Sequence, residues 1–299
     1  MKYEKTPLLF SEQVGLLLKR GLEGDPKLIE ERLTSVNYYR LTGYLHPYRM
    51  PGSDDYQPGT QFETVWDHYA FDRRLRLLVM DAIERIEIAV RTQLAYHHAQ
   101  IYKDPFAYAL LPSSIPALNA ASYHELLSRI RDETGRSADD FVSHFRTKYG
   151  AEHEFLPIWM AVEIMSFGAT QRFYRGASHQ VKQHVATHFG MPSRVLDSWL
   201  HALSVIRNIC AHHGRLWNKE LGVKPLIPYS DNYPEWHTPV QIPNNRVFCI
   251  LTLCRHCLSR IAPQSRWPSH VTQLLADFPA VSIKQMGFPS NWTNSPLWK

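Results

Sequence analysis

A single apolar stripe, unbroken by glycine or proline, constrains this chain more than any other feature. Between positions 62 and 102, apolar residues recur at intervals of three and four, which is the pattern of one face of an α-helix. The members of the stripe are Leu75, Leu78, Val79, Ala82, Ile83, Ile86, Val90 and Leu94. A helix of about 40 residues, rising ~1.5 Å per residue, extends ~60 Å, so it must kink or serve as a spine for the fold. The Asp104-Pro105 pair predicts its end.

The rest of the chain shows mainly helical periodicity. We expect further helices over 11–21, from Pro26 to about 36, over 122–133, 137–149, 157–175 and 178–189, from 192 to about 213, over 246–261 and near 269–277. The sequence contains no long strand pattern, internal repeat or low-complexity run. We therefore predict an all-α fold.

The composition excludes several classes of protein. Hydrophobic residues make up 44% and charged residues 20% of the 299 positions, which excludes wholesale disorder and a coiled-coil rod. A formal net charge of +5 is compatible with an RNA or DNA partner but does not demonstrate one. The sequence has no apolar run of transmembrane length and no signal-peptide core, so we expect a cytoplasmic protein that does not enter a membrane. Four cysteines, three of them within one apolar segment, do not form a disulfide framework.

The most specific motif is the heptad from Arg207 to His213, Arg-Asn-Ile-Cys-Ala-His-His, at the end of an apolar helix. Asn208 and His212 are four positions apart, about 40° around an ideal helix, and so share one face. Arg207 and His212 are five positions apart, about 140° around the helix. Arg207 must therefore reach around the helix, or the helix must distort, or a second copy of the chain must complete the site.

Arginine, asparagine and histidine together suit the chemistry of a phosphodiester. Histidine can accept or give a proton near neutral pH, and a guanidinium can hold a phosphate oxygen as negative charge develops on it. RNA brings its own nucleophile, the 2′-OH. The alternative is structural: Arg207 and His212 could bond the free carbonyls at a helix end, with Asn208 as an internal cap. Residue types and spacing leave both interpretations open.

The chain resembles the bacterial abortive-infection family of the AbiD/AbiF type, which belongs to the HEPN superfamily. The HEPN signature is an arginine followed several residues later by a histidine, here Arg207 and His212 in the form Arg-Asn-x-x-x-His. Further blocks resemble the family in order along the chain, so that the resemblance covers roughly residues 10–260. These blocks are 37–44, 71–76, 84–91, 166–168 and 207–218.

The resemblance implies a HEPN-like helical bundle built on the long spine helix, with added N-terminal helices. We accordingly expect an N-terminal helical segment over 1–60 packed on the core and a HEPN-like domain over 61–262. The residues from 263 to 299, which contain three prolines, are expected to form a loosely packed tail.

The resemblance also implies a function: a metal-independent endoribonuclease toxin of antiphage defence. Arg207, Asn208 and His212 would be its catalytic residues. Attack by the 2′-OH would leave a 2′,3′-cyclic phosphate and a 5′-OH. No cofactor or metal is expected. The expected partners are RNA as the substrate, a small structured RNA as a regulator and a second copy of the chain in a homodimer. The alternative is a non-catalytic RNA-binding or infection-sensing protein on the same scaffold.

Four further residues are candidates for supporting roles near the motif. His213 could bind RNA or carry the proton. Glu84, Glu87 and Arg91 on the long helix could form a second layer that holds Arg207. Glu87 and Arg91 equally fit an ordinary solvated pair at i, i+4, which would contribute a few tenths of a kcal/mol.

Two clusters rich in cations and aromatic rings are candidate RNA contacts. The first cluster contains Tyr38, Tyr39 and Arg40, and the second contains Arg73, Arg74 and Arg76. Aromatic rings beside a cation suit stacking on unpaired bases, and a basic stripe suits phosphates. The alternatives are a packed connection to the long helix for the first cluster and a solvated face for the second.

The segment Cys254-Arg255-His256-Cys257 raises the question of a zinc site. A single Cys-x-x-Cys pair is weak evidence without a second pair at a suitable spacing. Both cysteines also fit the buried face of an apolar helix. We therefore expect them to pack in the core rather than to bind metal.

Overall fold

The structure is a computed structural model that describes residues 2, 4 and 6–299. The chain divides into two compact units. The first contains the described residues up to Arg76 together with Val271–Ile283, and the second contains Leu77–His270 and Lys284–Lys299. The prediction of an all-α fold is confirmed. In the described residues, extended structure is confined to two short parallel strands and two isolated bridges.

The first unit is a group of short helices joined to the start of a long one. Its elements are α1 (Phe10–Lys19), β1 (Leu22–Glu23), α2 (Pro26–Ser35), α3 (Tyr38–Leu45), the 3-10 turn η1 (His46–Tyr48), β2 (Thr60–Gln61), the first part of α4 (Phe62–Tyr102) and most of α13 (Trp267–Asp277). The unit extends past the expected boundary at residue 60 because Phe71 on α4 packs edge-on against Phe278, with ring centroids 5.7 Å apart.

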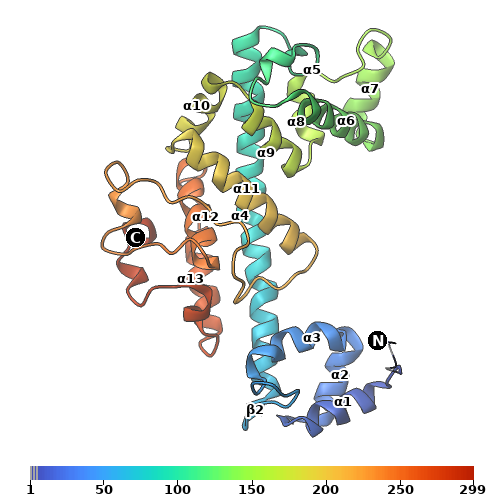
Figure 1. The fold of residues 1–299 in the computed structure, drawn as a ribbon, viewed down its shortest axis with the longest axis vertical. Helices are drawn as coiled ribbons and strands as arrows, with labels where there is room; N and C mark the ends of the chain where they lie inside the picture. The colour runs from blue at the N-terminus through green and yellow to red at the C-terminus, as the bar shows by residue number, and fades with distance from the viewer. Residues whose placement is uncertain (1, 3, 5) are drawn as a thin grey trace. The chain divides into compact units, whose positions relative to one another are not determined.

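The long helix is a single continuous element. α4 runs through 41 residues, and both units include part of it (Figure 1). The predicted stripe is its buried face: all of its members are fully enclosed except Leu78, which is half-buried. The helix ends at Tyr102, and the next residue, Lys103, is left-handed with a φ of 55°. The Asp104 carboxylate then accepts the backbone N–H of Phe106 at 2.8 Å.

The second unit is a bundle of helices arranged around the rest of α4. Its elements are α5 (Ala107–Leu110), η2 (Pro112–Ser114), α6 (Ala120–Arg136), α7 (Asp140–Tyr149), α8 (Ile158–Ile164), α9 (Phe167–Gly176), α10 (His179–His188), α11 (Ser193–Ala211), η3 (Pro234–Trp236), α12 (Val247–Ile261), η4 (Ile283–Met286), η5 (Trp292–Asn294) and η6 (Pro296–Trp298). In this unit α9 packs against α6 and α11, and α10 packs against α11 (Figure 1).

The helix predicted over 157–175 is divided into α8 and α9. Met165 is extended, with a ψ of 135°, and Ser166 caps the new helix in the same conformation. The break leaves backbone carbonyl and N–H groups without partners in their own helix, and side chains from other elements form hydrogen bonds with them. The Arg91 side chain donates to the carbonyls of Glu163, at 3.3 Å, and of Met165. The N–H of Ser166 donates to the carboxylate of Glu133 at 3.1 Å. Partners distant in sequence therefore stabilise this break.

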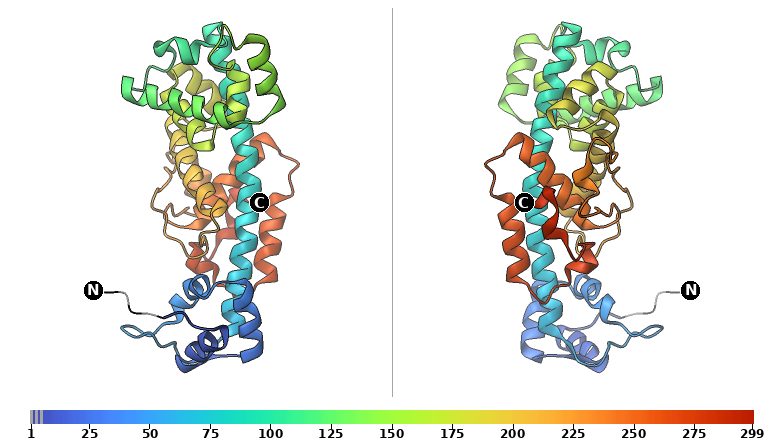
Figure 2. Two further views of the ribbon diagram at one scale, coloured as in Figure 1. Left: turned by 90° about the vertical axis from the view of Figure 1, so that its right-hand side faces the viewer. Right: turned by 90° about the vertical axis from the view of Figure 1, so that its left-hand side faces the viewer.

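The chain from 263 to 299 makes specific contacts that differ from the loose packing we expected. Trp267, at the start of α13, is only 1% exposed. Near the end of the chain, the Trp298 ring stacks on Phe248 with centroids 5.8 Å apart, and its indole N–H donates to the hydroxyl of Thr252 at 3.0 Å. Figure 2 shows this last segment beside α12. Aromatic rings that pack against the rest of the unit hold the segment in place, although its prolines prevent long helices.

Candidate active site

The motif from Arg207 to His213 lies where α11 ends. The last helical residue is Ala211, and His212 is the capping residue. His213 is left-handed, with a φ of 57°. Its N–H donates to the carbonyl of Cys210 at 3.0 Å, and the N–H of Gly214 donates to that of Ile209 at 2.7 Å. These two hydrogen bonds make a Schellman motif, in which most helices place glycine at the left-handed position. The helix therefore stops before His212, two residues earlier than predicted.

The three candidate catalytic residues surround this helix end. The Arg207 side chain is half-buried, whereas Asn208 and His212 are exposed. The Arg207 guanidinium donates to the side-chain oxygen of Asn208 at 3.3 Å. Because His212 has left the helix, the 140° separation of an ideal helix no longer fixes its imidazole relative to Arg207. The arrangement offers an exposed imidazole and a guanidinium oriented by an amide.

A buried ion pair on α4 lies close to Arg207. Glu87 is 8% exposed, and its carboxylate pairs with the guanidinium of Arg91. Burial raises the pKa of Glu87, while the positive charges of Arg91 and Arg207 act to lower it. Arg207 is therefore within electrostatic range of this carboxylate. Glu84, the other acidic candidate on this helix, is exposed.

The burial of Glu87 argues against a solvated surface pair with Arg91. Glu87 and Arg91 form the ion pair that their i, i+4 spacing predicts, but the pair is buried rather than solvated. Arg91 also donates to the carbonyls at the break between α8 and α9, so it ties α4 to that break. A buried carboxylate that interacts with Arg207 is the supporting arrangement that we considered from the sequence.

The opposite side of α11 belongs to the core. Cys210 is buried, and it contributes to the electrostatic environment of Cys254 together with Cys249 and Cys257. Burial raises the pKa of the Cys257 thiol to about 12 and raises those of Cys249 and Cys254 as well. All four thiols are free and buried, so the prediction of core packing for Cys254 and Cys257 is confirmed.

The first cluster of candidate RNA contacts lies in the other unit of the chain. Tyr39 is 85% exposed, and Arg40 is also exposed. Tyr38 is half-buried, and its hydroxyl accepts a hydrogen bond from Arg20 at 3.2 Å. Tyr39 and Arg40 are exposed to solvent, and the hydroxyl of Tyr38 is held by Arg20.

The second cluster is not a uniform basic stripe. Arg76 is 6% exposed and pairs with the fully buried carboxylate of Asp72, which also accepts the hydroxyl of Tyr44 at 2.5 Å. Arg74 pairs with Asp277 at 3.2 Å, and Arg73 is exposed. The prediction of RNA contact is therefore corrected for Arg76: its position on the apolar side of α4 makes it a core ion-pair partner.

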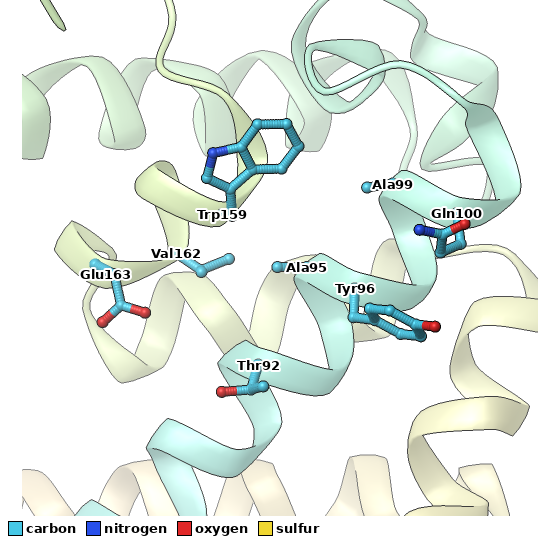
Figure 3. A pocket seen from close by; sticks show the side chains of 8 residues that line it. All are labelled: Thr92, Ala95, Tyr96, Ala99, Gln100, Trp159, Val162 and Glu163. Atoms are coloured by element: carbon cyan, nitrogen blue, oxygen red, sulfur yellow. The ribbon is translucent and has the colours of Figure 1, made fainter.

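A pocket of about 330 Å³ between α4 and α8 was not predicted from the sequence (Figure 3). It is lined by Thr92, Ala95, Tyr96, Ala99, Gln100, Trp159, Val162 and Glu163. Tyr96 is 59% exposed and Trp159 is 54% exposed. One signal was available, because Tyr96 lies off the apolar stripe of its helix. One residue of the pocket is connected to the Glu87–Arg91 pair, since the Glu163 carbonyl accepts a hydrogen bond from Arg91.

Comparison with known proteins identifies one family. A family model described as Abi-like protein matches residues 31–218, which includes the Arg207 to His213 heptad and all of α4 to α11. No curated protein and no solved structure gave a significant match. Within the described residues, no helix has both the length and the apolar character needed to span a bilayer. Because the match covers well over half of the chain, the protein belongs to the Abi-like family.

Proposed function

We propose that this protein is a metal-independent endoribonuclease of the HEPN type, acting in abortive-infection defence against phage. Membership of the Abi-like family supports the biological setting. The observation that carries the chemical proposal is the end of α11, where an exposed His212 follows an Arg207 that interacts with both Asn208 and the buried Glu87.

The proposed reaction is an in-line transesterification within the RNA strand. A 2′-OH attacks the adjacent phosphorus, so that a P–O2′ bond forms and the P–O5′ bond breaks. One histidine accepts the proton of the 2′-OH, and another general acid gives a proton to the departing 5′-oxygen. The products are a 2′,3′-cyclic phosphate and a 5′-OH. The nucleophile comes from the RNA and the proton carriers from the protein, so the reaction as written needs no metal.

Arg207 and Asn208 have different roles in this scheme. The Arg207 guanidinium stabilises the charge that builds on the non-bridging oxygens of the pentacoordinate phosphorus. Asn208 orients that guanidinium through the 3.3 Å hydrogen bond. Glu87 is a positioning residue, because its carboxylate acts on Arg207 from inside the bundle.

A homodimer would supply the second proton carrier. Two copies of the α11 end, brought together across a two-fold axis, would bring two copies of His212 and two of Arg207 face to face, so that each Arg207 could act with the His212 of the other chain. We further propose that RNA is also the regulator, as a small structured RNA that occupies the protein until infection.

The decisive experiment is RNA cleavage in the presence of EDTA, with the product ends identified. We expect wild-type protein to cleave and to leave a 2′,3′-cyclic phosphate, and Arg207→Ala and His212→Ala to be inactive. His179→Ala is the matched control, because it removes an exposed histidine from α10 and should cleave like wild type. Equal cleavage by wild type and His212→Ala would contradict the proposed mechanism. Tight RNA binding by every variant without any cleavage would favour the non-catalytic RNA-binding protein.

A further inference from the structure

We propose that the pocket between α4 and α8 binds an unpaired guanine base of the RNA and so contributes sequence preference to cleavage. The inference rests on the proposed function, because it assumes that RNA occupies the neighbouring site. The volume of about 330 Å³ lies in the range of small-ligand sites. The chemistry of its walls and of its two ends indicates the occupant.

The walls of the pocket suit a flat aromatic ring. Trp159 from α8 and Tyr96 from α4 lie on opposite sides of the opening, and the small side chains of Ala95 and Ala99 lie on the α4 side (Figure 3). Both aromatic residues are more than half exposed, although such side chains are usually covered in a folded protein. Exposed aromatic rings are the platforms on which proteins stack unpaired bases.

The two ends of the pocket carry opposite hydrogen-bonding character. Glu163 is exposed, and its carboxylate can only accept. At the other end, the side-chain oxygen of Gln100 already accepts from the Lys103 ammonium at 3.1 Å, which leaves the amide N–H groups to donate. Figure 3 shows Glu163 and Gln100 on opposite sides of the pocket.

Guanine matches this pattern better than the other bases do. Its N1–H and N2–H groups form a pair of donors that a carboxylate can accept together, and its O6 and N7 atoms are acceptors. Adenine, cytosine and uracil each lack that pair of adjacent donors. The Glu163 carboxylate also repels phosphate, so this end of the pocket favours a base over the backbone.

A chain of polar interactions connects the pocket to the candidate active site. Arg91 donates to the carbonyl of Glu163 and pairs with Glu87, which interacts with Arg207. Ala95, in the α4 wall of the pocket, is eight residues beyond Glu87 on one helix, which is a rise of about 12 Å and a rotation of about 80° around the axis. A strand that follows the surface of this helix could therefore place one base in the pocket while a phosphate a few nucleotides away lies at Arg207.

The test measures binding of fluorescent oligouridines that carry one central guanine or one central adenine. The His212→Ala protein serves as background so that the strand stays intact. We expect at least tenfold tighter binding of the guanine strand. Glu163→Gln should bring the affinities for the two strands close together. Trp159→Ala should lower the affinity for the guanine strand about tenfold. The matched controls, Glu152→Gln and Tyr229→Ala, change an exposed carboxylate and an exposed aromatic residue outside the pocket and should keep the preference.

Several outcomes would overturn the proposal. One is an equal change in the affinity for both strands in the Glu163→Gln variant, since that would indicate an effect of charge alone. Another is equal affinity for guanosine monophosphate and the guanine strand, because a free nucleotide would then be the occupant. A third is a halved mass in solution for Trp159→Ala, because a second copy of the chain would then cover this face. A fourth is the absence of measurable binding to either strand.

A parallel cleavage assay separates this inference from the proposed function. Cleavage by the wild-type protein without guanine preference would contradict only the pocket assignment. Guanine preference without cleavage would contradict only the ribonuclease.

Discussion

Two carboxylates on one helix, Glu84 and Glu87, differ in what surrounds them, and this difference predicts their effects on stability. Glu87 is 8% exposed and neutralises Arg91, which is itself largely buried. Replacing Glu87 with alanine leaves the Arg91 guanidinium without its counter-charge, so we expect the free energy of unfolding to fall by about 3 kcal/mol. Glu84→Ala, at an exposed position, should change it by less than ~0.5 kcal/mol. Urea unfolding of the two variants measures both changes in the free energy of unfolding. Equal losses of stability would contradict the assignment of Glu87 to a buried ion pair and of Glu84 to the surface.

The left-handed backbone at His213 predicts a second comparison of variants. A φ of 57° costs a residue with a Cβ about 1 kcal/mol, whereas glycine adopts this conformation freely. Both His213→Gly and His213→Ala remove the imidazole, so the difference between them isolates the backbone effect. We expect the glycine variant to be more stable than the alanine variant by about 1 kcal/mol in urea unfolding. If the alanine variant proved equally stable, this position would not need the left-handed conformation.

Among the elements, the sequence predicted the long helix well and the break between α8 and α9 not at all. Periodicity is a local signal, and the stripe on α4 is long enough to be unambiguous. The break at Met165 depends on Arg91 and Glu133, which reach it from other helices and bond its exposed backbone. The same reasoning covers the candidate site: the spacing predicted the Glu87–Arg91 pair, but only the packing of α4 near α11 brings Glu87 close to Arg207.

One buried histidine on α4 predicts how the stability of the helix bundle depends on pH. His98 is fully buried beside Phe173, and burial lowers its pKa from 6.5 to about 4. The unfolded chain therefore binds a proton that the folded chain rejects, and stability falls as the pH drops from about 6.5 to about 4. The loss assigned to this residue is about 3 kcal/mol.

The variant His98→Leu tests this dependence. Leucine cannot take up a proton, so the free energy of unfolding should vary less with pH than in the wild type. Urea titrations at about pH 7 and about pH 5 are sufficient, since roughly half of the effect falls between them. If the free energy of unfolding changed equally with pH in both proteins, His98 would be protonated in the folded state as well.

At the scale of the whole molecule, the organisation of the chain was the least predictable feature. The resemblance to a known family suggested boundaries near 60 and 262. The first unit instead includes Val271–Ile283, a segment about two hundred residues away along the chain. Its anchors are the contact between Phe71 and Phe278 and the ion pair between Arg74 and Asp277. Such contacts between distant segments leave no periodic signal in the sequence.

The proposed composite site makes a prediction about pairs of protomers that no single variant can test. If each site takes Arg207 from one chain and His212 from the other, a heterodimer of Arg207→Ala and His212→Ala contains one intact site and one site that lacks both residues. Random pairing of equal amounts gives half heterodimers, so co-expressed variants should recover about a quarter of wild-type cleavage. In the control, Arg207→Ala is co-expressed with the double variant that carries both Arg207→Ala and His212→Ala. No intact site can form in that mixture. If both residues instead come from the same chain, every site in the mixture is defective and no activity returns. A fully active monomer in sedimentation would contradict the composite site, because a single chain would then carry the whole reaction through its own Arg207 and His212.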